Sequence, residues 1–212
     1  MSPLPAIKNT EFDLDKKALA NRFGSRAESY EAATPVQKVM GQCLLDRIRS
    51  EQPNGGVREI LEVGCGTGRL TRALKALFPS ANITAIDISQ EMIDHAKKQV
   101  PGPAYLVIDA EEYLQSLNRQ FDLIVSNATV QWFVHLDKAI GRMCSALAPG
   151  GFLALGTFAE RTFCELADAF NCAYQKNQLA VQNHVVPMKS VDYLRQTLPE
   201  AELVERDILA HF

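Results

Sequence analysis

Three alternating glycines form the clearest candidate ligand site in this sequence. They lie in the segment Leu61-Glu62-Val63-Gly64-Cys65-Gly66-Thr67-Gly68, between a stretch typical of a β-strand and one typical of a helix. Glycine lets the backbone turn tightly and approach a ligand, because no side chain intervenes. The dinucleotide fingerprint G-x-G-x-x-G needs its third glycine at position 69, which is Arg69 here. The turn therefore gives less reason to expect a pyrophosphate as the ligand, and purely structural glycines are the alternative.

Two aspartates and an asparagine end neighbouring predicted strands. Asp87 ends the second strand, Asp109 the third, and Asn127 the fourth. Open parallel sheets bind ligands outside the carboxyl ends of their strands, so these side chains are expected beside the glycine turn. There Asp87 could accept hydrogen bonds from both hydroxyls of a ribose. Asp109 could accept from an adenine amino group while the amide of Ala110 meets a ring nitrogen. The alternative is that each aspartate caps the helix after it.

The elements that must position these residues alternate between strand and helix. Apolar runs predict strands at 60–63, 83–86, 105–108, 121–125 and 152–155. Helices are expected at 70–78, 89–100 and 136–147, the last ending at the segment 149–151. This alternation predicts a doubly wound α/β fold with a parallel sheet covered on both faces.

The two ends of the chain depart from this alternation. We expect a helix from Leu14 to Ala32 and a second to Ser50, with Thr34 as N-cap and Pro35 at the first helical position. Beyond the fifth strand, helices are expected at 161–180 and 190–198, followed by a sixth strand at 201–209.

Composition narrows the functional class. The 212 residues suit one domain, and a net charge of −3 argues against nucleic-acid binding. We find no apolar run long enough for a membrane span and no secretory signal. Five cysteines without a C-x-x-C pair disfavour disulfides and a metal site and fit a cytoplasmic protein. No Ser-His-Asp or Cys-His pattern predicts nucleophilic catalysis.

Taken together, these motifs resemble the class I S-adenosylmethionine-dependent methyltransferases. Segments 62–68, 85–88 and 107–110 match the first three family motifs, and Pro149-Gly150-Gly151 matches the one before strand five. The resemblance implies a Rossmann-like sheet (57–212) with N-terminal lid helices (1–56), and S-adenosylmethionine as cofactor. It implies these cofactor-binding residues: Glu62, Gly64, Cys65, Gly66, Gly68, Asp87, Ile88, Asp109, Ala110 and Asn127.

A narrower resemblance concerns the methyl acceptor. Segments 21–31, 36–37, 126–132 and 162–166 are similar to the malonyl-[acyl-carrier protein] O-methyltransferase family of biotin synthesis. This implies a partner, acyl carrier protein carrying a malonyl group, and esterification of the free malonyl carboxylate. Family members usually continue with a further helix and strand, so this sequence is a fragment, or its last strand is supplied otherwise, or its activity is reduced. For the form that ends at Phe212 we expect cofactor binding with slow turnover.

The same resemblance places Tyr30 nearest the reacting centre, on a lid helix, and Gln131 and Trp132 in the wall of the acceptor pocket. Packing against the sheet is the alternative for Tyr30, and a place in the core for Trp132. Three other functions stay open: a methyltransferase for a free small acid or amine, a non-catalytic cofactor-binding remnant, and an NAD-dependent oxidoreductase. Arg69 in place of the third fingerprint glycine argues against the oxidoreductase.

Overall fold

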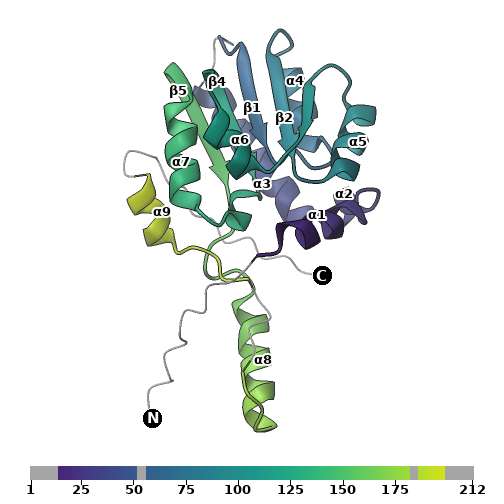
Figure 1. The fold of residues 1–212 in the computed structure, drawn as a ribbon, viewed down its shortest axis with the longest axis vertical. Coiled ribbons are helices and arrows are strands. Elements are labelled where there is room, and N and C mark those ends of the chain that lie inside the picture. The colour runs from purple at the N-terminus through teal and green to yellow at the C-terminus, as the bar shows by residue number, and fades with distance from the viewer. Residues whose placement is uncertain (1–13, 52–55, 182–185, 199–212) are drawn as a thin grey trace.

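The computed structural model describes residues 14–51, 56–181 and 186–198 (Figure 1). Within these ranges one parallel sheet is formed, with the strand order β3-β2-β1-β4-β5. Its strands are β1 (Glu59–Val63), β2 (Asn82–Asp87), β3 (Ala104–Val107), β4 (Phe121–Asn127) and β5 (Leu147–Gly156). The order reverses between β1 and β4, so their carboxyl ends flank the point where open α/β sheets bind ligands.

Helices cover both faces of the sheet, because its strands bury side chains on both sides. Ile60 packs with α3 (Pro35–Glu51), α4 (Arg69–Leu77) and α5 (Gln90–Gln99) on one face. Its neighbours Leu61 and Val63 pack with α6 (Ala110–Ser116), α7 (Leu136–Ser145) and α9 (Val191–Thr197) on the other. The prediction of a doubly wound α/β fold is confirmed.

Several helix starts follow the predicted capping chemistry. The Ser89 side chain accepts from the amide of Met92 at the start of α5, and Pro35 begins α3. Thr34 acts differently from our prediction: its hydroxyl donates to the carbonyl oxygen of Tyr30, at 2.7 Å. Thr34 therefore closes the preceding turn instead of capping α3.

The predicted single helix over residues 14–32 is wrong. The structure has α1 (Lys16–Gly24) and α2 (Tyr30–Ala33), with turns between them. Gly24 is buried against the start of α5, and a Cβ there would lie 2.3 Å from Oε2 of Glu91. This close contact directs the end of α1 onto the body of the protein, and the chain then turns before α2.

Strand β5 begins earlier than predicted, at Leu147, and includes the Pro149-Gly150-Gly151 segment that we expected to end a helix. Gly151 allows this pairing: a Cβ there would lie 2.9 Å from the carbonyl oxygen of Phe121. The register of β4 and β5 shifts between Phe121 and Leu123. The absence of a side chain therefore brings the two backbones together where the turn was expected.

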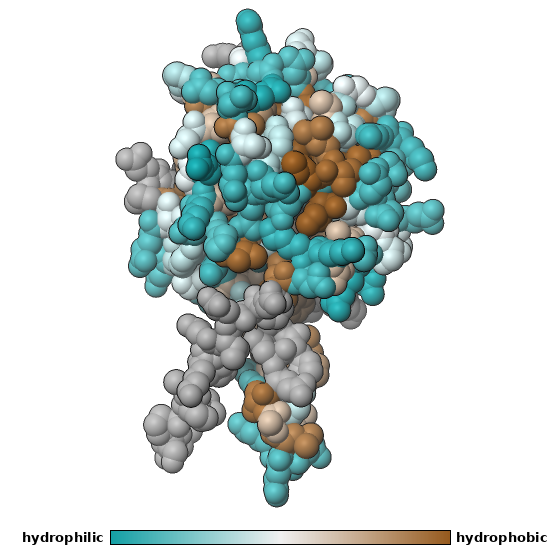
Figure 2. All heavy atoms as spheres, viewed as in Figure 1, coloured by the Kyte–Doolittle hydropathy of each residue, from teal (hydrophilic) through white to brown (hydrophobic). Residues whose placement is uncertain are grey.

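Of the two helices that follow β5, α9 packs on the sheet, whereas α8 (Cys164–Lys176) does not. Helix α8 is shorter than predicted and projects away from the body (Figure 1). Figure 2 shows apolar residues on α8 and on the body among mostly hydrophilic ones. The exposed large apolar side chains include Leu106, Val107 and Leu166. No described helix has the length and apolarity to cross a membrane. The predicted strand at 201–209 lies outside the described residues.

Candidate functional site

A cavity of about 280 Å³ lies at the carboxyl ends of the strands. Helices α1 and α2 lie at this same end of the sheet (Figure 1). The glycine turn after β1 and the segments that follow β2, β3 and β4 form its floor. Leu19, Phe23 and Tyr30 cover it from the lid helices, and Lys38 and Gln42 line it from α3. The cavity is thus enclosed between the sheet and the N-terminal helices.

Each glycine of the turn does something different. At Gly64 a Cβ would lie 2.0 Å from Oγ1 of Thr129, so this glycine admits the loop after β4. Gly66 has φ of +52° and lines the cavity, and its Cβ would meet nothing closer than Tyr30, at 4.0 Å. Gly66 therefore keeps the space between turn and lid open.

Gly68 is the one glycine of the turn that does not line the cavity. It has φ of +87°, and a Cβ there would lie 3.1 Å from Cβ of Ala96 on α5. Positive φ disfavours other residues, and the close approach leaves no room for a side chain. The structure thus places this predicted cofactor-binding residue at the contact between α4 and α5.

Asp87 is held beside the turn by backbone amides. Its Oδ2 accepts from the amide of Gly66 and its Oδ1 from that of Ser89, both at 2.9 Å. Burial raises the pKa of Asp87, while amide hydrogen bonds from Ser89, Gly66 and Ile88 act to lower it. A carboxylate oxygen can accept two hydrogen bonds, so the side chain can still accept from a ligand.

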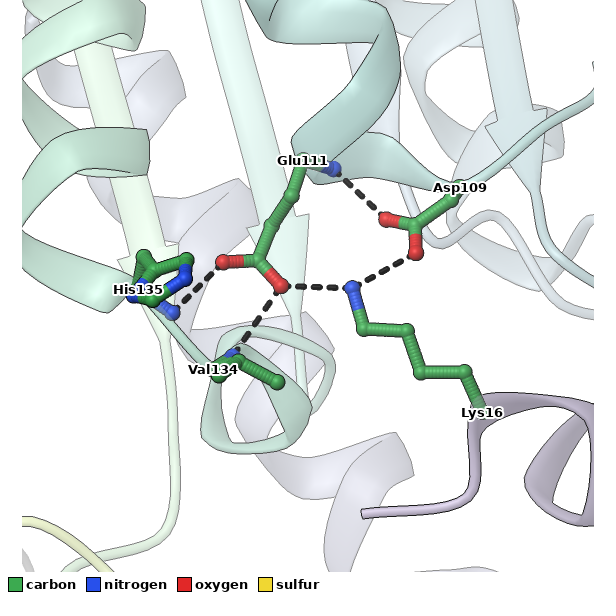
Figure 3. A network of polar contacts seen from close by, with 5 residues as sticks. All are labelled: Lys16, Asp109, Glu111, Val134 and His135. Atoms are coloured by element: carbon green, nitrogen blue, oxygen red, sulfur yellow. Dashed lines mark hydrogen bonds and ion pairs between the residues drawn. The ribbon is translucent and has the colours of Figure 1, made fainter. Parts of the chain in front are cut away.

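Asp109 belongs to a polar network that the sequence did not predict (Figure 3). Its Oδ1 accepts from the amide of Glu111, at 2.8 Å, which confirms the predicted capping of α6. Its Oδ2 accepts from Nζ of Lys16, at 2.6 Å. The same ammonium group donates to Oε2 of Glu111, at 2.5 Å. The Glu111 carboxylate also accepts from the amides of Val134 and His135.

Glu62 is the most perturbed acid among the residues that line the cavity. It is 1% exposed, and its Oε2 has no hydrogen-bond partner. Burial raises the pKa of Glu62 to about 8; Thr71 opposes this effect, and the negative charge of Asp87 adds to it. A buried carboxyl with an unpartnered oxygen at a cavity wall is suited to receive a donor from a ligand.

Three aromatic side chains pack edge to face over the cavity. The ring of Phe23 lies 6.1 Å from that of Tyr30 and 5.9 Å from that of Trp132, measured between centroids. All three line the cavity. Burial and the charge of Asp87 raise the pKa of Tyr30, so its hydroxyl stays protonated near neutral pH and can donate. The sequence predicted Tyr30 and Trp132 here but gave no sign of Phe23.

The other predicted residues divide between the cavity and its surroundings. Cys65, Ile88, Ala110 and Asn127 line the cavity. Burial, with the nearby Glu62 and Asp87, raises the pKa of the Cys65 thiol, so it is not a thiolate nucleophile.

Gln131 lies outside the lining, in contrast to its predicted place in the acceptor wall. Its Nε2 donates to the carbonyl oxygen of Ala128, at 2.6 Å, and its Oε1 accepts from Oγ1 of Thr157, at 3.3 Å. One end of the side chain is thus used within the segment that follows β4, and the other contacts the segment that follows β5.

The arrangement is suited to binding and orienting a ligand. The described residues contain no group of His, Cys, Asp and Glu placed to hold a metal ion. Acidic side chains at three strand ends face a roof of aromatic rings, and three cations, Lys16, Lys38 and Arg69, also line the cavity. Such a site can hold a polar ligand with several donors and exclude water from its centre.

Known proteins similar to this chain are methyltransferases. A family described as "Methyltransferase domain" matches residues 60–151. A malonyl-[acyl-carrier protein] O-methyltransferase of Priestia megaterium is 41% identical over 77% of this chain and 59% of its own length. One from Halalkalibacterium halodurans is 32% identical over 87% of this chain and 69% of its own length. The chain spans about three-fifths of several such relatives.

A solved structure supports the fold. N-methyltransferase NodS from Bradyrhizobium japonicum, in complex with S-adenosyl-L-homocysteine, aligns with a TM-score of 0.62 at 22% identity. The alignment covers 89% of this chain and 86% of NodS.

Proposed function

Because the chain belongs to the malonyl-[acyl-carrier protein] O-methyltransferase family of methyltransferases, we propose that it methylates the free carboxylate of a malonyl thioester on acyl carrier protein. S-adenosylmethionine is the proposed methyl donor. The chain spans 59% of the length of the relative from Priestia megaterium. The residues that line the cavity support the proposed methyl donor more directly than the proposed acceptor.

The unpartnered oxygen of Glu62 is the observation that carries the proposed cofactor. S-adenosylmethionine has an ammonium group, and a buried carboxyl at the cavity wall fits that donor. Gly66 leaves space open beside the turn, and Asp87 and Asp109 line the same cavity, which supports the proposal that they bind the ribose and the adenine. The acidic side chains at the ends of the neighbouring strands β1, β2 and β3 thus suit the ammonium group, the ribose and the adenine of the cofactor, in that order.

The proposed reaction requires little acid–base catalysis by the protein. The bound cofactor supplies an electrophilic methyl group on a sulfonium. A malonyl carboxylate is ionised near pH 7, so no general base is needed to activate it. Phe23, Tyr30 and Trp132 exclude water, and the Tyr30 hydroxyl can hold the acceptor by donating to it. Orientation and desolvation then supply the rate enhancement.

Lys38 is our candidate for binding the acceptor carboxylate. It lies on the face of α3 that lines the cavity, and its ammonium group has no ion-pair or hydrogen-bond partner in the described ranges 14–51, 56–181 and 186–198. The other cations of the lining are engaged: Lys16 contacts two carboxylates, and Arg69 donates to the carbonyl oxygen of Glu31, at 2.6 Å. An exposed lysine can reach an acidic group that arrives from solvent without first breaking another bond.

Mass spectrometry of the reaction products tests the proposal. The protein and S-adenosylmethionine are mixed separately with malonyl-loaded carrier protein, malonyl-CoA and free malonate, and each product is examined for one added methyl. We expect the carrier-bound substrate to be methylated fastest. Preferred methylation of free malonate would instead support an enzyme for free small acids. Absence of transfer to all three, with cofactor still bound, would contradict the proposed reaction.

A further inference from the structure

Helix α1 is attached to the body of the protein near both of its ends. At its end, Gly24 packs on the start of α5, where an added Cβ would lie 3.0 Å from Oγ of Ser89. At its beginning, Lys16 reaches the start of α6. Leu19 and Phe23, between these attachments, line the cavity. Ligand exchange past this side of the cavity therefore requires one of the attachments to move.

The Lys16 attachment is the one that directly involves a predicted cofactor contact. In Figure 3 its ammonium group lies between the carboxylates of Asp109 and Glu111, at 2.6 and 2.5 Å. Partial burial lowers the pKa of Lys16, but the hydrogen bonds and charges of Asp109 and Glu111 outweigh it and raise that pKa. The ammonium group therefore stays charged at neutral pH.

The carboxylates do not depend on Lys16 to satisfy them. Asp109 accepts from the amide of Glu111, and Glu111 accepts from the amides of Val134 and His135. Lys16 adds a connection between α1 and the start of α6. The Lys16 side chain is 25% exposed, that of Asp109 24% and that of Glu111 10%. The pair with Asp109 is thus the more accessible to water, and we expect it to open more readily than the pair with Glu111.

We propose that Lys16 is a positioning residue for the cofactor, which holds α1 closed and orients the Asp109 carboxylate toward the adenine. This inference rests on the proposed function. One lone pair of Asp109 Oδ2 is used by Lys16, and the carboxylate keeps others for the adenine amino group. When Lys16 is lost, α1 opens more often and the Asp109 carboxylate is held only by the amide of Glu111. The binding-competent fraction therefore falls, and the apparent affinity falls with it.

The test compares Lys16→Met with Lys17→Met, an exposed neighbour on the same helix. Calorimetry with S-adenosylhomocysteine measures affinity, and the fluorescence of Trp132, the one tryptophan of the sequence, follows dissociation. We expect Lys16→Met to bind about tenfold more weakly, which corresponds to about 1.4 kcal/mol, and to release the ligand faster. Lys17→Met should match the wild type.

Two further measurements separate positioning from general stability. In an Asp109→Asn background, Lys16→Met should lower affinity much less, because the partner through which it acts is already changed. Hydrogen exchange of α1 amides in the free protein should accelerate in Lys16→Met but not in Lys17→Met. If Lys16→Met does not fold, Lys16→Arg replaces it, and near wild-type affinity of Lys16→Arg is then expected.

The outcomes are distinguishable from failure of the proposed function. A wild-type protein that does not bind S-adenosylhomocysteine contradicts the proposed function itself. A wild-type protein that binds it, with unchanged affinity, dissociation and exchange in Lys16→Met, overturns the role of Lys16 alone. Equal losses in the wild-type and Asp109→Asn backgrounds overturn the orientation of Asp109 by Lys16.

Discussion

Replacing Glu62 with glutamine should change how stability depends on pH. Glu62 is 1% exposed, its Oε2 has no partner, and burial raises its pKa from the ordinary 4.5 to about 8. Between these two values the folded protein binds a proton that the unfolded chain has released. The contribution of Glu62 is therefore fully present below about pH 4.5 and is lost as pH rises toward 8.

The size of the effect follows from the interval between the two pKa values. Each unit corresponds to about 1.4 kcal/mol, so the interval corresponds to a loss of about 4–5 kcal/mol by pH 9. Glutamine has nearly the same shape and no charge to bury, so Glu62→Gln should not lose this part. Near pH 9 the variant should melt at least about 10 °C above the wild type, whereas near pH 5 the two should be similar.

Thermal unfolding from pH 5 to pH 9, without ligand, measures the difference directly. Asp87, whose pKa is also raised, is present in both proteins, so its contribution largely cancels in the comparison. Parallel stability curves for wild type and Glu62→Gln would refute the reasoning, because they would mean that the Glu62 carboxylate is as well solvated folded as unfolded. If the proposed ammonium contact exists, the same variant should bind S-adenosylmethionine more weakly.

Three further substitutions address the proposed roles of cavity residues. Asp87→Ala should weaken S-adenosylmethionine binding by about 2–4 kcal/mol in calorimetry, and unchanged affinity would remove Asp87 from the ribose site. Tyr30→Phe should lower kcat more than cofactor affinity, because the hydroxyl is proposed to act on the acceptor; equal losses would indicate a residue that only holds the cofactor. Lys38→Met should raise KM for a carboxylate acceptor about tenfold. The control is Lys98→Met, because Lys98 is exposed on α5, and this variant should leave KM unchanged. Equal KM values for the two variants would exclude Lys38 from acceptor binding.

Local signals in the sequence were sufficient for the central sheet and for the floor of the cavity. Strand-end residues such as Asp87 and Asp109 could be placed together from their order alone, because parallel strands connected by helices end at one edge. The capping of α5 by Ser89 is likewise a property of a few adjacent residues. Both kinds of inference depend on short-range chemistry and on a topology with few alternatives.

The roles within the glycine turn were less accessible. The spacing of Gly64, Gly66 and Gly68 predicted a turn near a ligand, but it did not show that Gly68 faces Ala96 instead of the cavity. That distinction depends on how closely α5 approaches α4, which is set by packing between segments far apart in the sequence. Gln131 shows the same limit, because one of its two side-chain partners is Thr157, which follows β5 and is distant in the sequence.

The cover of the cavity was decided by tertiary structure. Residues 14–32 have the pattern of one helix, yet the chain turns after Gly24 because that glycine packs on α5. Lys16 reads as an ordinary surface lysine, and only the folded chain brings it to Asp109 and Glu111, at sequence separations of 93 and 95. Phe23 joins Tyr30 and Trp132 for the same reason. The period of apolar residues along the chain determines which face of a helix or strand is buried. The partner of a side chain that is distant in the sequence depends instead on a three-dimensional contact, which no local sequence pattern specifies.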